Sequence, residues 1–242
     1  MSLSERYRSR AIPTGISVAT VRDFVDSFEH LHDLAVAAGD LKDVQRPWMV
    51  KAVLATVPLG GSICEIGAGE PLVAGRLADL GYRCTIVDPY DGSGNGPTDL
   101  ARFAASRPAV RFVPARFGPG LPELEDVRFD AIYSISVLEH LGREAIREVV
   151  EGCRLHLRPG GRLLHAIDFV SAGPGAEHHR TMLVDFLAHY GIREHTVDEA
   201  IRRAEPDPET YLLSAESHNR WRGRMPYESF PMRRVMSVQC VL

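Results

Sequence analysis

Two carboxylates, Glu65 and Asp88, have a glycine-containing turn between them and carry the clearest chemistry in this sequence. The run Ile63-Cys64-Glu65-Ile66 is apolar except for its glutamate, and Gly67-Ala68-Gly69 follows it directly. Glycine at such a turn lets a ligand come close to the backbone, because no Cβ blocks the approach. The helix expected beyond the turn leaves free N–H donors at the same place. The pattern indicates a ligand site at the end of a buried strand.

The acids beside this turn indicate the kind of ligand. A dinucleotide-binding fingerprint has a third glycine, which is missing here. Glu65 and Glu70 place negative charge where a pyrophosphate would lie, so they disfavour a polyanion and suit a cation such as a sulfonium with an ammonium group. A Gly-x-Gly turn that binds nothing is the alternative.

The other carboxylate of the pair, Asp88, ends the next strand, 19 residues after Gly69. An acid in this position reaches the ribose hydroxyls of an adenosine bound at the sheet edge. Pro89 and Tyr90 follow it and would border one face of the adenine. The alternative is an aspartate that only caps a turn.

The elements that position these residues follow from the pattern after Ser62. Short apolar runs alternate with helical patterns there, which is typical of a parallel sheet covered on both faces. We expect strands at 62–66, 84–88, 110–114, 129–135, 162–168 and 234–242, with a short one at 211–214. We expect helices near 71–80, 97–106, 143–157 and 180–190, and a turn at 158–161.

The first part of the chain predicts a helical cap over residues 1–58. Apolar residues recur at three- and four-residue steps over 18–38, and a second helix is expected at 47–57 with Pro47 in its first turn. Residues 1–13 are polar, and we expect them to be loosely ordered.

Five motifs, taken together, resemble those of the class I S-adenosylmethionine (SAM) methyltransferases in order and spacing. They are 65–69, 87–89, 129–134, 137–141 and 157–161. The resemblance implies a Rossmann-like, doubly wound α/β sheet of seven strands whose last strand is antiparallel. It also implies that residues 59–242 are the methyltransferase domain, with an acceptor-site insertion around 170–230.

The resemblance also assigns the cofactor site. It implies that Glu65 and the turn Gly67, Ala68 and Gly69 hold the methionine end, and that Asp88 binds the ribose. Pro89 and Tyr90 would border the adenine, and Ser134 would lie along the cofactor. One departure is Ala115-Arg116-Phe117, which stands where the family has an acid after its third strand.

Methyl transfer is an in-line displacement, so the protein positions the acceptor and helps to remove its proton. His140 follows the strand at 129–135 and is the candidate base, and His179 is a second catalytic candidate. The Glu139-His140 pair could equally cap the helix that follows.

A divalent metal such as Mg²⁺ is a further hypothesis. The arrangement resembles metal-assisted O-methyltransferases, in which a metal orients two hydroxyls and lowers the proton affinity of the oxygen. The candidate ligands are Glu139, His140, Asp168, His178 and His179. Ser136 stands where that pattern has its first acid, and an exposed polar loop with surface histidines is the alternative.

Two other sets of residues have competing interpretations. His165 lies within the apolar strand at 162–168 and is interpreted as a hydrogen-bonded core histidine. Trp221, with His218, Arg220 and Arg222, would form a lid or acceptor wall, or would only pack on the surface.

Composition narrows the classes of protein to which this chain can belong. The four cysteines are far apart with no Cys-x-x-Cys pair, which disfavours structural zinc and fits a reducing cytoplasm. No apolar run is long enough to cross a bilayer, and the polar start does not predict a signal peptide. The net charge is −4, and from Arg193 onward acids match the arginines in number, which argues against a nucleic-acid partner.

These observations together predict a SAM-dependent methyltransferase acting on a hydroxyl of a small molecule, a sugar or another polyhydroxylated metabolite. The rivals are a small-molecule N-methyltransferase, a nicotinamide oxidoreductase and a non-catalytic SAM-binding protein. No membrane partner is expected, and a homodimer is compatible with the sequence.

Overall fold

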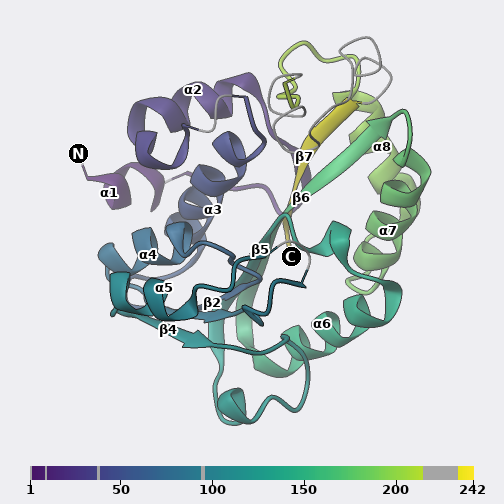
Figure 1. The fold of residues 1–242 in the computed structure, drawn as a ribbon. Coiled ribbons are helices and arrows are strands. Elements are labelled where there is room, and N and C mark those ends of the chain that lie inside the picture. The colour runs from purple at the N-terminus through teal and green to yellow at the C-terminus, as the bar shows by residue number, and fades with distance from the viewer. Residues whose placement is uncertain (1, 9, 37–38, 94–95, 215–233) are drawn as a thin grey trace. The chain divides into compact units, whose positions relative to one another are not determined.

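The computed structural model describes residues 2–8, 10–36, 39–93, 96–214 and 234–242 (Figure 1). The chain divides into two compact units. The first unit holds Met1–Ile12, Met49–His165 and Val241–Leu242, and the second holds Pro13–Trp48 and Ala166–Cys240. Strand β6 (Leu157–Ala172) runs through both. These units do not follow the expected boundary between cap and catalytic domain at residue 58, and that boundary stays a prediction.

A sheet of seven strands, as counted over the described residues, has the order β1-β7-β6-β5-β2-β3-β4. Strand β2 (Ser62–Ile66) pairs in parallel with β3 (Arg83–Val87) and β5 (Phe129–Ile135), and β4 (Val110–Val113) pairs in parallel with β3. Leu163 and Leu242 exchange both backbone hydrogen bonds at 2.9 Å, which is an antiparallel pattern and sets the direction of β7 (Arg234–Val241). The expected seven-stranded α/β sheet with an antiparallel last strand is confirmed.

Strand β6 begins earlier than expected, so the predicted turn at 158–161 is wrong. Helix α6 (Arg143–His156) ends at His156, and Leu157 is already extended with φ −82° and ψ 136°. The strand therefore starts directly after the helix, and the left-handed Gly160 lies within it.

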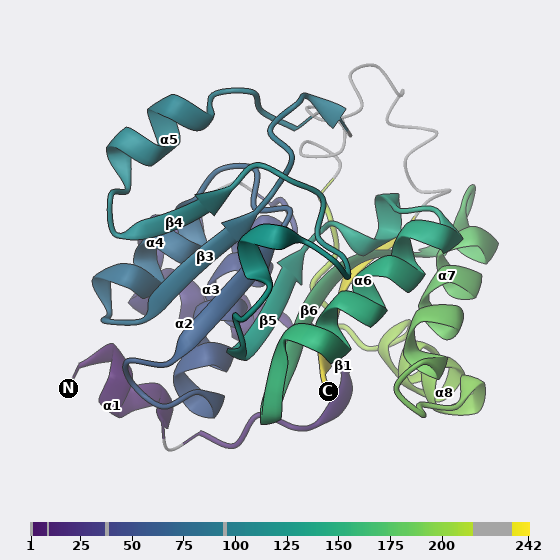
Figure 2. The same ribbon diagram turned by 90° about the horizontal axis from the view of Figure 1, so that it is seen from below.

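The other helices of the first unit are α1 (Leu3–Arg8), α4 (Leu72–Asp79) and α5 (Leu100–Ser106). Helix α4 packs against β3 and α5 against β4 (Figure 2). Helix α1 contradicts the expectation of a loosely ordered start. Its Tyr7 is 1% exposed, and the Lys51 ammonium lies 5.6 Å from the centre of the Tyr7 ring, so this residue anchors the helix.

Helix α3 (Lys42–Thr56) begins five residues before the expected start at 47. Pro47 therefore lies inside the helix and not in its first turn, which corrects the prediction. Proline cannot donate the helical hydrogen bond there. Val44 and Val53 of the same helix are both 0% exposed, and their burial offsets that loss.

The second unit contains β1 (Gly15–Val18), α2 (Val21–His30), the short helix η1 (His32–Leu34), α7 (Ala176–Ala188) and α8 (Glu194–Ala204). Neither β1 nor α8 was predicted. The strand expected at 211–214 is wrong, because this stretch makes only the isolated bridge Leu212–Met236. A buried apolar cluster forms the core of the unit: Ala19, Leu41, Val44, Val170, Tyr211 and Val235.

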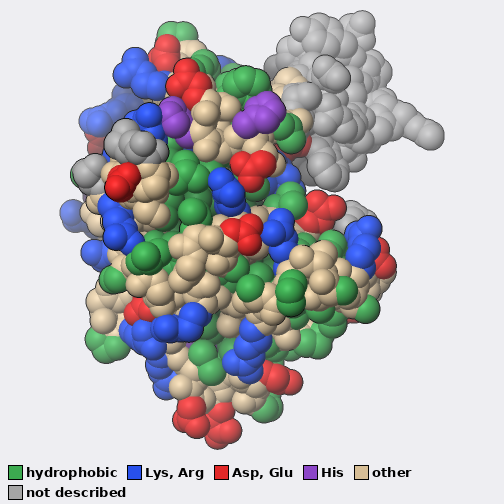
Figure 3. Space-filling view, turned by 90° about the vertical axis from the view of Figure 1, so that its left-hand side faces the viewer, with side chains coloured by type: hydrophobic (Ala, Val, Ile, Leu, Met, Phe, Trp, Pro, Cys, Tyr) green, Lys and Arg blue, Asp and Glu red, His purple; other side chains and the backbone are tan. Residues whose placement is uncertain are grey.

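Helix α2 begins with a capping box, in which the Asp23 amide donates to Thr20 Oγ1 at 3.1 Å and the Thr20 amide donates to Asp23 Oδ2 at 2.8 Å. Its apolar stripe is only partly covered, since Val25 and Phe28 are both 49% exposed. On the face shown in Figure 3, hydrophobic, basic and acidic side chains are interspersed. No helix within the described ranges is long and apolar enough to cross a membrane.

Candidate functional site

The glycine turn predicted after β2 is present, and its backbone favours glycine at both positions. Gly67 and Gly69 have φ angles of +65° and +59°, in the left-handed region that favours glycine. A Cβ on Gly67 would lie 2.8 Å from Val137 Cγ2, so this position has no room for a side chain. A Cβ on Gly69 would meet only Pro97 Cδ at 3.8 Å, so the second glycine is less crowded than the first.

Asp88 joins this turn to the loop after β3. Its Oδ2 accepts from the Gly69 amide at 3.0 Å, and its Oδ1 accepts from the Tyr90 amide at 2.9 Å. The residue is 8% exposed. Each carboxylate oxygen can accept about two hydrogen bonds, so both keep capacity for the hydroxyls of a ligand. The acid and the glycine turn, separated by 19 residues in the sequence, are therefore brought together.

Glu65 is buried, and its carboxylate faces the first turn of α4. Glu65 Oε2 accepts from the Tyr133 hydroxyl at 2.8 Å and from the Ala74 amide at 3.2 Å. A negative charge at a helix N-terminus is favourable. Burial, followed by the charge of Glu65, raises the pKa of Tyr133 well above its usual value, so the hydroxyl keeps the proton that it donates. The structure thus gives Glu65 a bracing contact within the fold, and its contact with a methionine group stays a prediction.

Tyr90, next to Pro89, forms one wall beside Asp88. It is 7% exposed, has a φ of +51°, and its ring centre lies 6.0 Å from that of Phe103 and 6.2 Å from that of Phe112. Its hydroxyl is buried and has no hydrogen-bond partner among the described residues. Burial and the neighbouring Asp88 raise the pKa of the Tyr90 phenol, so it stays neutral.

Ser134, near the end of β5, is 0% exposed, and its Oγ lies 2.8 Å from His165 Nδ1. His165 is also 0% exposed, and burial lowers its pKa to about 3. The interpretation of His165 as a hydrogen-bonded core histidine is confirmed. The Ser134 hydroxyl therefore faces His165. Its contact with a cofactor stays a prediction.

Two residues of the loop after β5 were expected along the cofactor only as unnamed neighbours of Ser134. Ser136 has a φ of +50°, an uncommon conformation for serine, and Val137 packs against Gly67. Uncommon conformations of this kind gather at ligand sites. The signal that could have found them is their place directly after a buried strand that pairs with β2.

The candidate base His140 ends the short helix η4 (Leu138–His140), which follows β5. His140 is exposed, while its neighbour Glu139 is 6% exposed. The two adjacent residues therefore differ: the acid lies inside the fold and the imidazole lies at its surface.

The remaining predicted residues lie in the second unit. Asp168 Oδ1 accepts from Gln45 Nε2 at 2.7 Å, and His179 Nδ1 lies 2.9 Å from the Asp168 main-chain oxygen. His178 is exposed, and the His178 and His179 ring centres are 5.8 Å apart. Gln45 is a partner that the sequence reasoning missed.

The proposed metal ligands do not form a metal site in the described part of the chain. No group of three or more His, Cys, Asp or Glu side chains there could hold an ion. The residues present therefore do not fit the Mg²⁺ hypothesis. His218, Arg220, Trp221 and Arg222, the expected lid or acceptor wall, lie outside the described residues.

Comparisons with known proteins indicate the family of the region that contains this site. A family model described as a methyltransferase domain matches residues 64–165. The uncharacterized protein Rv1509 of Mycobacterium tuberculosis (strain ATCC 25618 / H37Rv) is 32% identical over 122 residues, which are 48% of this chain and 38% of that protein. The uncharacterized protein MT1557 of strain CDC 1551 / Oshkosh matches to the same extent. The chain thus spans well under half the length of these relatives.

Among solved structures, the 1,6-didemethyltoxoflavin-N1-methyltransferase of Burkholderia thailandensis is similar with a TM-score of 0.50 and 19% identity, covering 90% of this chain and 85% of that one. A TehB-like SAM-dependent methyltransferase from Corynebacterium glutamicum has a TM-score of 0.47 and 16% identity, over 90% of this chain and 98% of that one. At 19% identity, the likeness to the Burkholderia thailandensis enzyme shows a similar fold and does not show a shared activity. The resemblance to the class I SAM-dependent methyltransferases is confirmed by the family match over residues 64–165.

Proposed function

We propose that this chain transfers the methyl group of SAM to a hydroxyl group of a small molecule, with His140 as the base. The observation that supports it most is the double hydrogen bonding of Asp88 to the Gly69 and Tyr90 amides. These two hydrogen bonds hold the acid next to the glycine turn and to Tyr90, as a bound adenosyl group would require.

The residues of the first unit fit an adenosyl ligand. The carboxylate of Asp88 would accept hydrogen bonds from the ribose hydroxyls with the lone pairs that the two amides leave. The turn at Gly67 and Gly69 would hold the methionine end, and bound SAM supplies an activated methyl group on a sulfonium.

The contribution of the chain to the transfer is removal of the acceptor proton. Imidazole is the side chain that most often does this near neutral pH. We assign this role to His140 because it is exposed and directly follows the loop of Ser136 and Val137. Its imidazole would take the hydroxyl proton as the acceptor oxygen bonds to the methyl carbon of SAM, with SAH as the second product.

The predictions of a metal, of a second catalytic histidine and of a saccharide acceptor have less support. Magnesium is left out of the proposal, because the donors expected to hold it are not gathered into a site. The catalytic role of His179 stays a prediction, because the contact of its Nδ1 with the Asp168 carbonyl orients the ring and does not itself decide the role of Nε2. A saccharide or other polyhydroxylated acceptor stays a prediction.

The proposal is tested by incubating the protein with SAM and a panel of small alcohols, sugars and amines, and measuring S-adenosylhomocysteine (SAH) and methylated product. We expect methylated oxygen in at least one hydroxyl compound. Products from amines alone would favour the N-methyltransferase. Heat on titration with SAH but no product from any acceptor would favour the non-catalytic binding protein. Stabilisation by NADH and not by SAH would favour the oxidoreductase, since a ligand that binds the native state raises the melting temperature.

A further inference from the structure

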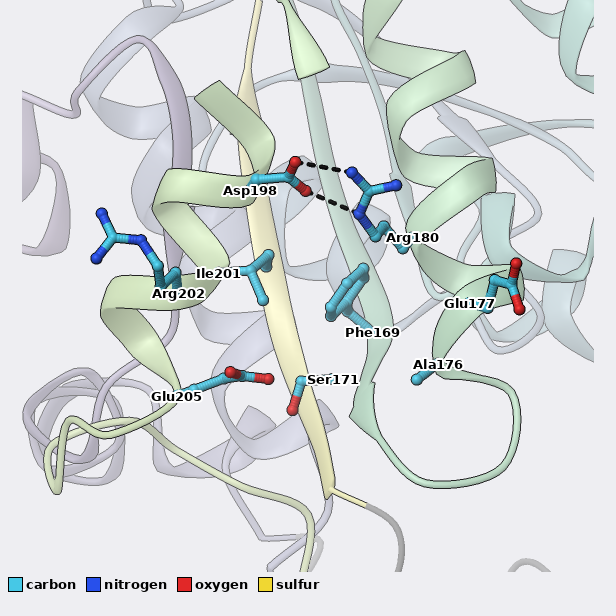
Figure 4. Close-up of a pocket in the computed structure, with 9 residues that line it drawn as sticks. All are labelled: Phe169, Ser171, Ala176, Glu177, Arg180, Asp198, Ile201, Arg202 and Glu205. Atoms are coloured by element: carbon cyan, nitrogen blue, oxygen red, sulfur yellow. Dashed lines mark hydrogen bonds and ion pairs between the residues drawn. The ribbon is translucent and has the colours of Figure 1, made fainter. Parts of the chain in front are cut away.

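The second unit contains a pocket that the proposed function does not use. It has a volume of about 310 Å³, at the lower end of the range of small-molecule sites. Strand β6, helix α7, helix α8 and the residues next to them form its walls (Figure 4). The lining residues are Phe169, Ser171, Ala176, Glu177, Arg180, Asp198, Ile201, Arg202 and Glu205.

The centre of this pocket is apolar. Figure 4 shows the side chains of Ile201 and Phe169 facing each other across it. Phe169 is 2% exposed, and its ring packs edge-on against His179 at 6.4 Å, so the ring is held in place. Phe169 is already covered by the fold, so a ligand here would mainly bury the apolar surface that Ile201 still exposes, which is favourable by about 25 cal/mol per Å².

The basic residues of the pocket have little to offer an anion. Arg180 donates to the two carboxylate oxygens of Asp198 at 2.8 and 2.7 Å and to Glu194 at 2.6 Å. Two carboxylates thus surround one guanidinium. Arg202 is exposed and points away from the pocket in Figure 4.

Glu205 is the charge that faces inward. It is half-buried at the C-cap of α8, points toward Ser171 in Figure 4, and its side chain has no hydrogen bond or ion pair in the described structure. The C-terminal end of a helix carries partial negative charge, which adds to that of this carboxylate. Glu177, by contrast, is exposed and points outward.

We propose that this pocket binds a small organic cation, an amine with an apolar body. The ammonium group would donate to the carboxylate of Glu205, and the apolar body would lie between Ile201 and Phe169. The inference goes beyond the proposed methyl transfer and stands on the contacts of the second unit alone.

Titration calorimetry with three probes of similar shape tests this proposal: 2-phenylethylamine, 2-phenylethanol and 3-phenylpropionate. We expect the amine to bind, the alcohol to bind at least about tenfold more weakly, and the acid to give no heat, because only the first forms a charge-assisted hydrogen bond with Glu205. No heat with 2-phenylethylamine, or equal affinity for all three probes, would overturn the proposal.

Two matched variants locate the site. Glu205→Gln should weaken 2-phenylethylamine about tenfold, whereas Glu177→Gln, the same change on a side chain that points outward, should alter the affinity by less than about twofold. Ile201→Ala should weaken the amine and the alcohol alike. Equal effects of Glu205→Gln and Glu177→Gln would contradict the assignment. Titration of the same preparation with SAH measures the proposed cofactor site separately, so failure of one proposal is distinguishable from failure of the other.

Discussion

The Tyr133 hydroxyl donates to Glu65 Oε2 at 2.8 Å, and the same oxygen accepts from the Ala74 amide at 3.2 Å. One buried carboxylate thus links strand β2, strand β5 and the first turn of α4. The turn that runs from Glu65 to α4 is held at both ends, before any ligand binds. The glutamate of the first motif therefore has a structural role in addition to the cofactor role that the family resemblance implies.

Removal of this hydroxyl should destabilise the protein. We expect Tyr133→Phe to lower the free energy of unfolding by about 1–3 kcal/mol, because the buried carboxylate loses a hydrogen bond. Tyr90→Phe is the matched control: that hydroxyl has no partner among the described residues, so the ligand-free protein should lose less than about 0.5 kcal/mol. Urea denaturation of both variants measures the difference, and equal losses would contradict the role given to Glu65.

A side chain at Gly67 should disturb the turn in two ways. Gly67→Ala should cost about 1 kcal/mol for the left-handed backbone and more for the contact with Val137. Gly120→Ala isolates the first cost, because Gly120 has a φ of +73° and nothing within 4 Å of its Cβ position. The double variant Gly67→Ala/Val137→Ala should be more stable than the sum of the two single losses predicts, because the smaller side chain removes the clash. A double variant whose loss equals that sum would argue against the clash.

Protonation of His165 should destabilise the fold in acid. Its pKa is about 3 in the folded protein and about 6.5 when unfolded, so the unfolded state binds the extra proton between these values and stability is lost as the pH falls below 6.5. From pH 7 to pH 5 this group alone should remove about 2 kcal/mol of unfolding free energy.

The variant His165→Asn should lose less stability than the wild type over the same pH interval, by about that amount. His195→Asn, at an exposed position, should follow the wild type. Guanidinium denaturation at both pH values provides the comparison. Parallel losses in the wild type and in His165→Asn would show that the core histidine is not the group responsible.

His140→Asn tests the base directly. With the acceptor that the panel identifies, kcat should fall at least about a hundredfold, because a positioned base contributes on that scale. The affinity for SAH should change less than about twofold, since the cofactor contacts lie elsewhere. His195→Asn serves again as the exposed control, and a kcat unchanged by His140→Asn would remove this residue from the chemistry.

The sequence predicted the sheet well where strands are buried on both faces. Runs such as Ile63–Ile66 are apolar enough to stand out locally. Strand β1 has only four residues, and its place depends on pairing with β7, which no local pattern reveals. Helix α8 did carry a signal, because Val197, Ile201 and Ala204 recur at helical spacing, and it could have been predicted.

The candidate site shows the same division. The glycine turn and Asp88 were predicted together because strand ends at one edge of a parallel sheet converge. The Gln45–Asp168 contact joins residues 123 positions apart through the fold, and no spacing rule anticipates it. The proposed metal ligands were grouped by residue type alone, and the described structure does not gather them.

The most direct test of the cofactor site is titration calorimetry with SAH on the wild type, Asp88→Asn and Asp91→Asn. Asp91 is exposed and three residues further along, so it controls for the same chemical change outside the pocket. We predict that SAH binds the wild type and Asp91→Asn alike and binds Asp88→Asn at least about tenfold more weakly. Absence of heat with the wild type, or an affinity left unchanged by Asp88→Asn, would contradict the assignment of this pocket to the adenosyl cofactor.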